Sequence, residues 1–569
     1  MAIELNRQQD RAVNALGHCS VLACPGSGKT RVLSMRAARL LAEHKTGRLC
    51  AVTFTRDAAK ELKSRILALC GEHEARRLAV GTFHSVARAQ LLKLRKFSKI
   101  KLLSDGERKG LLRRCYSQYE CDTPFDKVLS AIDRAKSKLG RTGFNDPGVE
   151  GIFNAYQALL VAERVMDFSD ILLETVNGIR DASIKPLAVR WLLADEFQDA
   201  DEVQTQWVIA HGKAGVEITI VGDDDQSLYA FRNALGYAGM QDVTKALAAQ
   251  QITLPINYRC APNILSGAAK LIANNPDRAN KNIVADRATT GIIKAHRAAD
   301  RYDEARLVVE AIQASTGQSW AILARTNSLL EIVESELALK GVEYRLAGGK
   351  SVWDGIVGSA LVGLLRSVQS DGWTGMANAL SICGIRSELL NLSVHGPESC
   401  AQMLERILGS LQDSDARTRK TVASLLAGYG VWQNQVALGN TTLAVYAASS
   451  WLAQRVKPER GELVKKLAEI IAKRKGSIAQ RLNTLSRLSD PDVAAGVVLT
   501  TLHGSKGLEF DGVWMLGAED GNLPHPDSTE DEERRLFYVG MTRARNRLEI
   551  SSSIEDGLAS RFMAEAELF

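Results

Sequence analysis

The sequence predicts an α/β protein with two parallel sheets, and two observations support this fold class. Short apolar runs alternate with amphipathic helical segments in residues 1–88, a pattern typical of parallel sheets. Helical spacing then dominates in residues 89–170 and again in residues 371–490, and strand-like runs return after each stretch. The expected strands are residues 21–23, 49–54, 78–82, 191–194 and 218–221 in the first sheet, and 291–295, 321–324, 497–502, 513–516 and 547–551 in the second.

The order of these segments predicts two sheet-forming lobes, each interrupted by a mainly helical insertion. A chain of 569 residues is long enough for several domains. The expected parts are a first lobe in residues 1–88 and 171–250 with its insertion at 89–170, and a second lobe in residues 251–370 and 491–569 with a shorter insertion at 371–490.

The composition excludes several classes of protein. Hydrophobic residues make up 45% of the chain and charged residues 24%, which is normal for a globular protein, and the net charge of +6 is a mild basic bias. No apolar run approaches the ~20 residues that a membrane helix needs, and the polar N-terminus does not resemble a signal peptide. The nine cysteines form no CxxC pair and no zinc-ligand spacing, so we expect reduced thiols in a cytoplasmic protein.

A glycine-rich loop follows the first expected strand. Its sequence, ACPGSGKT, leads into an amphipathic segment, so several backbone N–H groups can point at one polyphosphate at the positive end of a helix. Lys29 is expected to reach the outer phosphates, and the Thr30 hydroxyl is expected to hold Mg²⁺. A chance Gly-Lys-Thr in a tight turn is the alternative. The expected phosphate-binding residues are Ala23, Pro25, Gly26, Ser27, Gly28, Lys29 and Thr30.

Two adjacent carboxylates end a later apolar run, in the sequence WLLADEFQD. If the run is a parallel strand, its carboxyl end opens onto the crevice where ligands bind. Asp195 can then hold Mg²⁺, and Glu196 can orient and deprotonate the attacking water. The pair by itself fits an acidic helix N-terminus equally well, and the phosphate loop upstream favours the catalytic interpretation.

Further motifs occur in a fixed order along the chain. They are LNRQQ at residues 5–9, TFT at 53–55, GTFHS at 81–85, VGDDDQSLYAFRNA at 221–234, LPINYR at 254–259, TTLHGSKGLEF at 500–510 and EERRLFYVGMTRA at 532–544. Together they resemble the UvrD/Rep/PcrA family of superfamily 1 helicases over residues 5 to about 565. The resemblance implies two RecA-like lobes of the P-loop NTPase type, with ATP and Mg²⁺ as cofactors.

The resemblance also implies roles around the nucleotide. Gln9 would read the adenine edge, Tyr258 would stack on the base with Arg31 nearby, and Glu509 would bind the ribose. Within the same resemblance, the residues implied at the γ-phosphate are Gln226, Arg259 and Arg543. Guanidinium groups suit phosphate oxygens because they can bind them through two parallel hydrogen bonds.

A single-strand DNA track needs cationic groups for phosphates and aromatic faces for bases. Relatives usually carry Trp where this chain has Phe231, so stacking there would be weaker. Arg56 fits either a phosphate contact or a solvated helix start, and a structural role is equally open for the two histidines. The expected DNA contacts are Phe54, Arg56, His84, Tyr229, Phe231, Arg232 and His503.

These features predict an ATP-dependent 3′-to-5′ single-stranded DNA translocase and helicase, with single-stranded DNA and single-strand/duplex junctions as its nucleic-acid partners. One alternative is a motor that needs a protein partner, such as a nuclease in repair or phage defence, for useful unwinding. Another is a regulatory module that binds ATP and DNA but barely hydrolyses. The presence of the expected catalytic residues argues against such a regulatory module; they are Lys29, Asp195, Glu196, Gln226 and Arg543.

Overall fold

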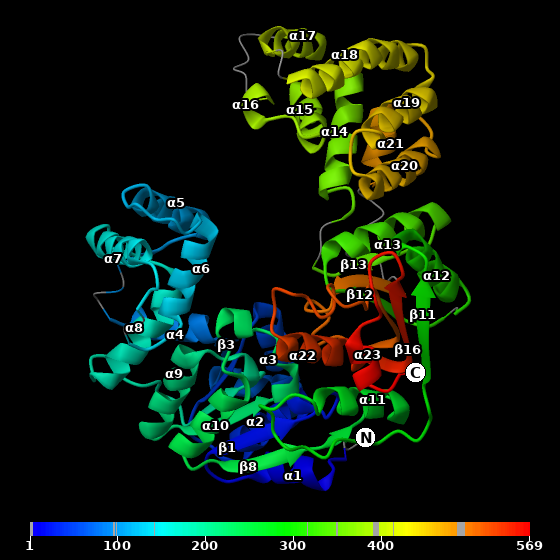
Figure 1. Cartoon of the computed structure of the whole chain (residues 1–569). Helices are drawn as coiled ribbons and strands as arrows, with labels where there is room; N and C mark the ends of the chain where they lie inside the picture. The colour runs from blue at the N-terminus through cyan, green and yellow to red at the C-terminus, as the bar shows by residue number, and fades with distance from the viewer. Residues whose placement is uncertain are drawn as a thin grey trace. The chain divides into compact units, whose positions relative to one another are not determined.

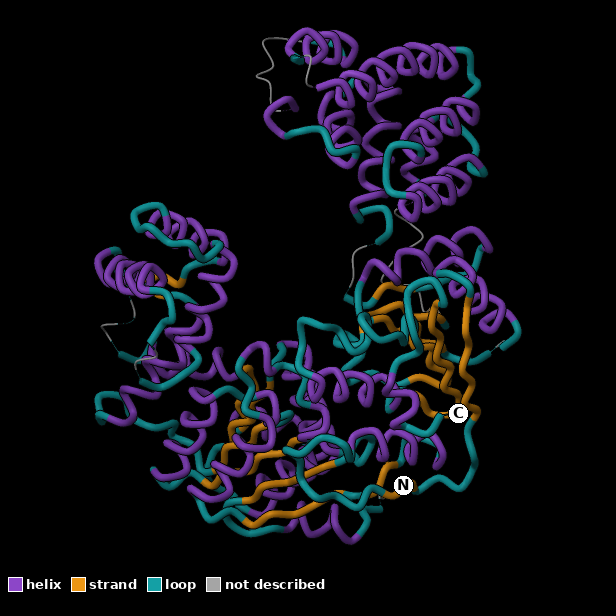
Figure 2. Tube along the Cα trace, viewed as in Figure 1, coloured by secondary structure: helices purple, strands orange, loops and turns teal. Residues whose placement is uncertain are grey.

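The computed structural model describes residues 4–94, 97, 99–140, 143–315, 317–348, 351–390, 398–412, 415–485 and 496–568. The chain divides into two compact units (Figures 1 and 2), each of which contains one large parallel sheet. The first unit comprises Met1–Leu265, Leu271–Thr289 and Arg534–Tyr538, and the second comprises Ser266–Lys270, Thr290–Glu533 and Val539–Phe569.

The first sheet has six strands in the order β3-β2-β6-β7-β1-β8, and neighbouring strands pair in parallel. The strands are β1 (Cys19–Ala23), β2 (Leu49–Thr53), β3 (Leu78–Thr82), β6 (Trp191–Ala194), β7 (Glu217–Gly222) and β8 (Gln250–Leu254). The packed helices are α1 (Arg7–Asn14), α2 (Lys29–Glu43), α3 (Arg56–Cys70), α4 (Phe83–Leu91), α8 (Phe168–Arg180), α9 (Glu202–Lys213) and α10 (Gly236–Ala246). The five strands expected for this sheet are confirmed.

The apolar runs are continuous because both faces of this sheet are covered. Successive residues of a strand point to opposite faces, and Val21 accordingly packs in the cluster with α2 and α3, whereas Leu22 packs in the cluster with α4, α8 and α9. Leu193 and Leu192 divide between the same two clusters. This double burial fixes the register of the strands that carry the site.

The sixth strand corrects the expected boundary near residue 251. Strand β8 pairs with β1, with Cys19 opposite Gln250 and Ala23 opposite Leu254, so the chain stays in the first sheet to residue 254. Its N-terminal half is exposed because it lies at the sheet edge. The short parallel pair β9 (Ile256–Asn257) and β10 (Val284–Ala285) also belongs to the first unit.

A helical insertion lies between β3 and β6 in the chain. It contains α5 (Asp105–Tyr116), α6 (Phe125–Lys136), α7 (Pro147–Ala162) and the short parallel pair β4 (Lys101–Leu102) and β5 (Val165–Met166). Its three helices share a small core that includes Leu112, Ile132, Ile152 and Tyr156.

The second sheet also has six parallel strands, in the order β11-β16-β15-β12-β14-β13. They are β11 (Ile292–Ala298), β12 (Trp320–Ala324), β13 (Arg345–Leu346), β14 (Val497–Thr501), β15 (Phe510–Met515) and β16 (Ala544–Ser553). Helices α12 (Arg301–Gln313) and α13 (Asn327–Lys340) pack against this sheet, and α23 (Arg561–Glu565) lies in the same unit. Helices α11 (Pro262–Ile272) and α22 (Glu530–Met541) are each divided between the two units. The five expected strands are again confirmed, and β13 is an edge strand too short to stand out in the sequence.

The second helical stretch begins earlier than residue 371. It comprises α14 (Ile356–Ser370), α15 (Trp373–Ile382), α16 (Ser387–Leu390), α17 (Cys400–Ser410), α18 (Ala416–Ala437), α19 (Thr441–Ala453), α20 (Pro458–Ala472) and α21 (Ile478–Asn483). These helices share one apolar core. Within the described residues, none of the helices is both long and apolar enough to cross a membrane.

Candidate nucleotide site and DNA contacts

The glycine-rich loop joins β1 to α2 and has a backbone shape that its glycines permit. Gly26 and Gly28 have φ angles of +61° and +80°, which side chains disfavour. A Cβ atom on Gly26 would also lie 2.7 Å from the Cβ atom of Arg259. Gly28 is the N-cap of α2 and offers no side-chain cap, so the first N–H groups of the helix are not capped by its own N-cap residue.

The cationic and hydroxyl groups of the loop face carboxylates on neighbouring strands. Lys29 Nζ lies 3.9 Å from Asp223 Oδ2, just after β7. The Thr30 hydroxyl donates a hydrogen bond of 3.3 Å to Asp195 Oδ2, just after β6. Strands β6, β7 and β1 are adjacent in the sheet, so their carboxyl ends bring these groups together. A hydroxyl and a carboxylate at this spacing offer the oxygen ligands that Mg²⁺ prefers.

The two adjacent carboxylates differ in environment. Burial and the neighbouring Glu196 raise the pKa of Asp195 to about 7, while Lys29 opposes the increase. Glu196 has a left-handed backbone with φ of +52°, a conformation that costs free energy in a residue with a side chain. Asp195 is therefore buried, whereas Glu196 is half-buried and lies at the strained turn.

Sequence reasoning missed Gln198, which connects Glu196 to the next strand end. The Gln198 amide donates to Glu196 Oε2 at 2.6 Å, and its oxygen accepts from the Asp223 backbone N–H at 3.0 Å. Gln198 is fully buried. An amide two residues after the acidic pair was the only local signal for this role.

Gln226 lies in the short 3₁₀ turn Asp224–Gln226 and is buried. Its amide donates to Asp223 Oδ2, the same oxygen that faces Lys29. The candidate γ-phosphate sensor is thus attached, through one carboxylate, to the lysine of the phosphate loop.

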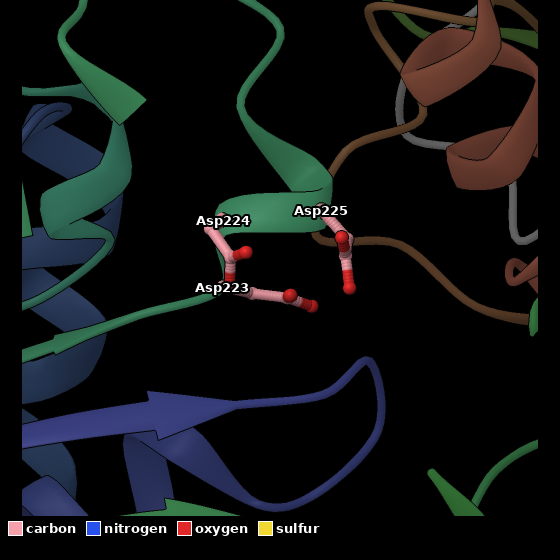
Figure 3. Close-up of side chains that lie close together, drawn as sticks. All are labelled: Asp223, Asp224 and Asp225. Carbon is pink, nitrogen blue, oxygen red and sulfur yellow. The ribbon is translucent and has the colours of Figure 1, made fainter. Parts of the chain in front are cut away.

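The carboxylates of Asp223, Asp224 and Asp225 lie close together (Figure 3) and resemble a metal site. One oxygen from each lies within 4.8 Å of the other two. A buried ammonium group is bound among them. Lys281 Nζ lies 2.8, 2.6 and 2.8 Å from the three aspartates in that order, and it donates to Ala23 O at 3.2 Å.

A second cation completes this group. Arg278 binds Asp225 through two hydrogen bonds of 2.8 and 2.9 Å. Burial by itself would lower the pKa of Lys281, but the three aspartates raise it well above its usual value, so the ammonium stays charged. We call Asp223, Asp224, Asp225, Arg278 and Lys281 the site cluster. The sequence did not indicate either cation.

Four of the residues assigned to the base or γ-phosphate lie around the phosphate loop in the first unit. Gln9 is buried and donates to Ser27 O at 2.9 Å. Tyr258 is 39% exposed, its hydroxyl accepts from Asn6 at 2.7 Å, and its backbone N–H donates to Gly26 O at 3.1 Å. Arg31 donates to Glu4 O at 2.8 Å, and Arg259 packs beside Gly26.

Glu509 and Arg543 belong to the second unit. Glu509 accepts from Arg545, and the buried Arg543 donates to Val539 O at 3.0 Å and to Leu508 O at 3.3 Å. Their assignment to the ribose and the γ-phosphate remains a prediction.

Several expected DNA contacts carry aromatic or cationic groups at the end of the first sheet. Phe54 follows β2 and packs against Phe83 with ring centroids 5.3 Å apart. The Arg232 guanidinium lies 5.6 Å from the centroid of the Tyr229 ring. Arg56 is exposed at the first position of α3. The side chain of Phe231 lies outside the described part of the structure.

The two histidines differ in surroundings. His84 stacks on Phe168 with ring centroids 4.0 Å apart and planes 18° apart, and burial lowers its pKa to about 4. His503 follows β14 in the second unit, where burial and Arg325 lower its pKa. Phe168 is 55% exposed, and it was not among the expected DNA contacts because residues 89–170 were assigned to the helical insertion.

A glycine-rich loop that faces two acidic strand ends of a parallel sheet defines the chain as a P-loop NTPase. Comparisons with known proteins narrow this class. Residues 5–238 match the family model of the UvrD/REP helicase N-terminal domain, and residues 252–356 and 449–555 match that of the UvrD-like helicase C-terminal domain. The chain belongs to the UvrD-like helicase family and is an ATP-dependent DNA helicase.

Individual relatives agree with this assignment. DNA helicase II of Haemophilus influenzae is 30% identical, over 98% of this chain and 86% of the relative. The ATP-dependent DNA helicase UvrD1 of Mycobacterium tuberculosis is 30% identical, over 97% of this chain and 82% of the relative. The ATP-dependent DNA helicase Rep of Escherichia coli is 28% identical, over 96% of this chain and 90% of the relative.

Proposed function

We propose that the protein moves along single-stranded DNA in the 3′-to-5′ direction and unwinds duplex DNA at single-strand/duplex junctions. The observation that supports the motor is the assembly at the strand ends of the first sheet, where Thr30 meets Asp195 and Asp223 joins Lys29 to Gln226. The direction rests on the family resemblance.

We propose these roles for the site residues. Lys29 binds the outer phosphates, Thr30 and Asp195 hold Mg²⁺, and Glu196 deprotonates the attacking water. Gln198 holds the Glu196 carboxylate through its 2.6 Å hydrogen bond and thereby fixes the base against the strand end that carries Asp223. When bound, the metal ion neutralises charge that develops on the phosphate oxygens.

We propose that Tyr258 stacks on the adenine from a segment that the phosphate loop itself positions. Its backbone N–H binds Gly26 O, and the Asn257 amide binds Pro25 O at 2.7 Å. Gln9 borders the same loop at Ser27. Movement of the loop on phosphate binding would therefore move the stacking ring with it.

For the DNA track, we propose the stacking rings Phe54, Tyr229, Phe231 and Phe168, with Arg56, Arg232 and His84 as further DNA contacts of the first unit. His503 is proposed as a DNA contact of the second unit. Phe168 is included because an apolar ring that is more than half exposed and already stacked on His84 presents a face to solvent. Base stacking on such rings contributes about 1–3 kcal/mol per base.

The test is ATP-driven strand displacement on two matched duplexes that carry either a 3′ or a 5′ single-stranded tail. Displacement from the 3′ tail alone is the expected result. Displacement from the 5′ tail alone would contradict the proposed direction. If DNA stimulates ATP turnover but neither duplex opens, a partner such as a nuclease or repair protein is required, and adding the candidate partner should then restore displacement.

A further inference from the structure

The Lys281 side chain contacts both the start of the phosphate loop and a carboxylate that faces the loop. Its ammonium donates to Ala23 O, at the last residue of β1, and it binds Asp223 Oδ1 at 2.8 Å. The other oxygen of Asp223 faces Lys29 and Gln226. One carboxylate therefore separates Lys281 from two candidate nucleotide-binding groups.

The distances show which cation neutralises Asp223. Lys281 Nζ is at hydrogen-bond distance from Asp223, whereas Lys29 Nζ, at 3.9 Å, is beyond the usual hydrogen-bond range. A buried carboxylate that loses a close cation attracts another one strongly, because the surrounding dielectric constant is low. Without Lys281, Asp223 would draw Lys29 into a close ion pair.

Lys281 cannot follow Lys29 toward a nucleotide, because its own segment is fixed at several points. Arg278 holds Asp225 through two hydrogen bonds, and the Ala279 backbone N–H donates to Asp224 Oδ2 at 2.7 Å. The Lys281 side chain is fully buried, as are the three carboxylates it binds. Among the described residues, Arg278 and Lys281 form the close ion pairs with the three aspartates and Lys29 lies farther off, at 3.9 Å from Asp223, so Asp223 already has a close cation before a phosphate arrives.

We propose that Lys281 is a positioning residue for ATP binding: it neutralises Asp223 and so leaves the Lys29 ammonium available to the phosphates. This role rests on the proposed function of the phosphate loop. It assigns a purpose to the buried ammonium beyond balance of charge, because only Asp223 of the three aspartates contacts both Lys281 and Lys29.

The test compares two double variants that remove the same buried charges, Lys281→Met/Asp223→Asn and Lys281→Met/Asp224→Asn. Each loses one ammonium and one carboxylate, so neither leaves more unpaired charge than the other. Affinity is measured with a fluorescent, slowly hydrolysed ATP analogue in the presence of Mg²⁺, on the full chain, after thermal unfolding has shown that both variants are folded.

The variant that keeps Asp223 should bind the analogue about tenfold more weakly than the variant that lacks it, because its Lys29 is held by Asp223 and a charge-assisted contact to phosphate contributes on that scale. Equal affinities in the two variants would overturn the role of Lys281. Lys29→Ala is measured in parallel. If it binds the analogue as well as the unaltered protein does, the phosphate-loop assignment fails instead, and the two failures are distinguishable.

Discussion

Two buried lysines of the first unit are bound by aspartates, and the two clusters differ in what they are attached to. Lys281 belongs to the site cluster, whose carboxylates are consecutive in the chain and border the phosphate loop. Lys136, at the end of α6, binds Asp167 and Asp170 at 2.7 Å each, at the start of α8. We call these three residues with Tyr156 the insertion cluster, since the Tyr156 hydroxyl also donates to Asp167 at 2.9 Å.

The difference shows that the same kind of buried ion pair, a lysine bound by aspartates, can serve two purposes. In the insertion cluster the ammonium joins helices α6, α7 and α8, and Asp167 and Asp170 cap α8 reciprocally. In the site cluster one carboxylate continues to Lys29 and Gln226. A loss of stability should therefore be common to the two clusters, whereas a loss of nucleotide binding should be confined to one.

The largest expected effect tests the shared part of the comparison. Lys281→Met and Lys136→Met each leave buried carboxylates without their ammonium, and each should lower the free energy of unfolding by about 3–5 kcal/mol. Chemical denaturation of both variants measures this. The comparison also requires that Lys136→Met, at a temperature where it is folded, binds ATP like the unaltered protein. Weaker ATP binding in that variant would break the distinction between the clusters.

The next largest effect concerns Lys29, the phosphate-loop residue that faces Asp223 of the site cluster. Lys29→Ala should lower ATP turnover by about 10²–10³-fold, the scale seen when one preorganised donor to a reacting centre is removed. Its unfolding midpoint should stay close to that of the unaltered protein, because the ion pair that Lys29 forms within the described part of the chain is the long one to Asp223. Turnover is measured with saturating single-stranded DNA. Glu196→Gln serves as the matched control, since it should lose turnover and still bind ATP.

Much of this site could be predicted because it depends on strand ends. Apolar runs that stop at a glycine-rich loop or at two acids predict where parallel strands end, and parallel strands bring such ends to one edge. Thr30 and Asp195 therefore meet although they are 165 residues apart. The two-sheet fold class was predictable for the same reason.

The site cluster could not be predicted, because nothing local marks its cations. Lys281 and Arg278 lie 58 and 53 residues from the aspartates they bind, in a loop without periodicity. A charged residue in such a loop is normally solvated, and Lys281 is buried only because of the tertiary structure. Strand β8 was not expected and the lobe boundary was placed at residue 251 for a related reason, since an edge strand pairs through backbone groups that the side-chain pattern does not specify.

The smallest expected effect concerns the helix that the insertion cluster caps. Phe168 is the first residue of α8, directly after the Asp167 cap, and its exposed ring stacks on His84. Phe168→Ala should weaken binding of single-stranded DNA by about 1–3 kcal/mol, the contribution of one stacked base. Fluorescence anisotropy with a labelled oligonucleotide measures this, and Tyr119→Ala, which removes a 42% exposed ring from the insertion, is the control.

The salt dependence of the same titrations separates stacking from charge. Burial lowers the pKa of His84 to about 4, so its ring is neutral at pH 7 and the stacked pair carries no charge. Phe168→Ala and His84→Gln should then leave the slope of log affinity against log salt unchanged, whereas Arg232→Gln should reduce it by about one counterion, roughly 0.7 for single strands. If Phe168→Ala lowered the slope instead, the loss of its ring would have displaced a phosphate contact, and α8 would hold the DNA backbone rather than a base.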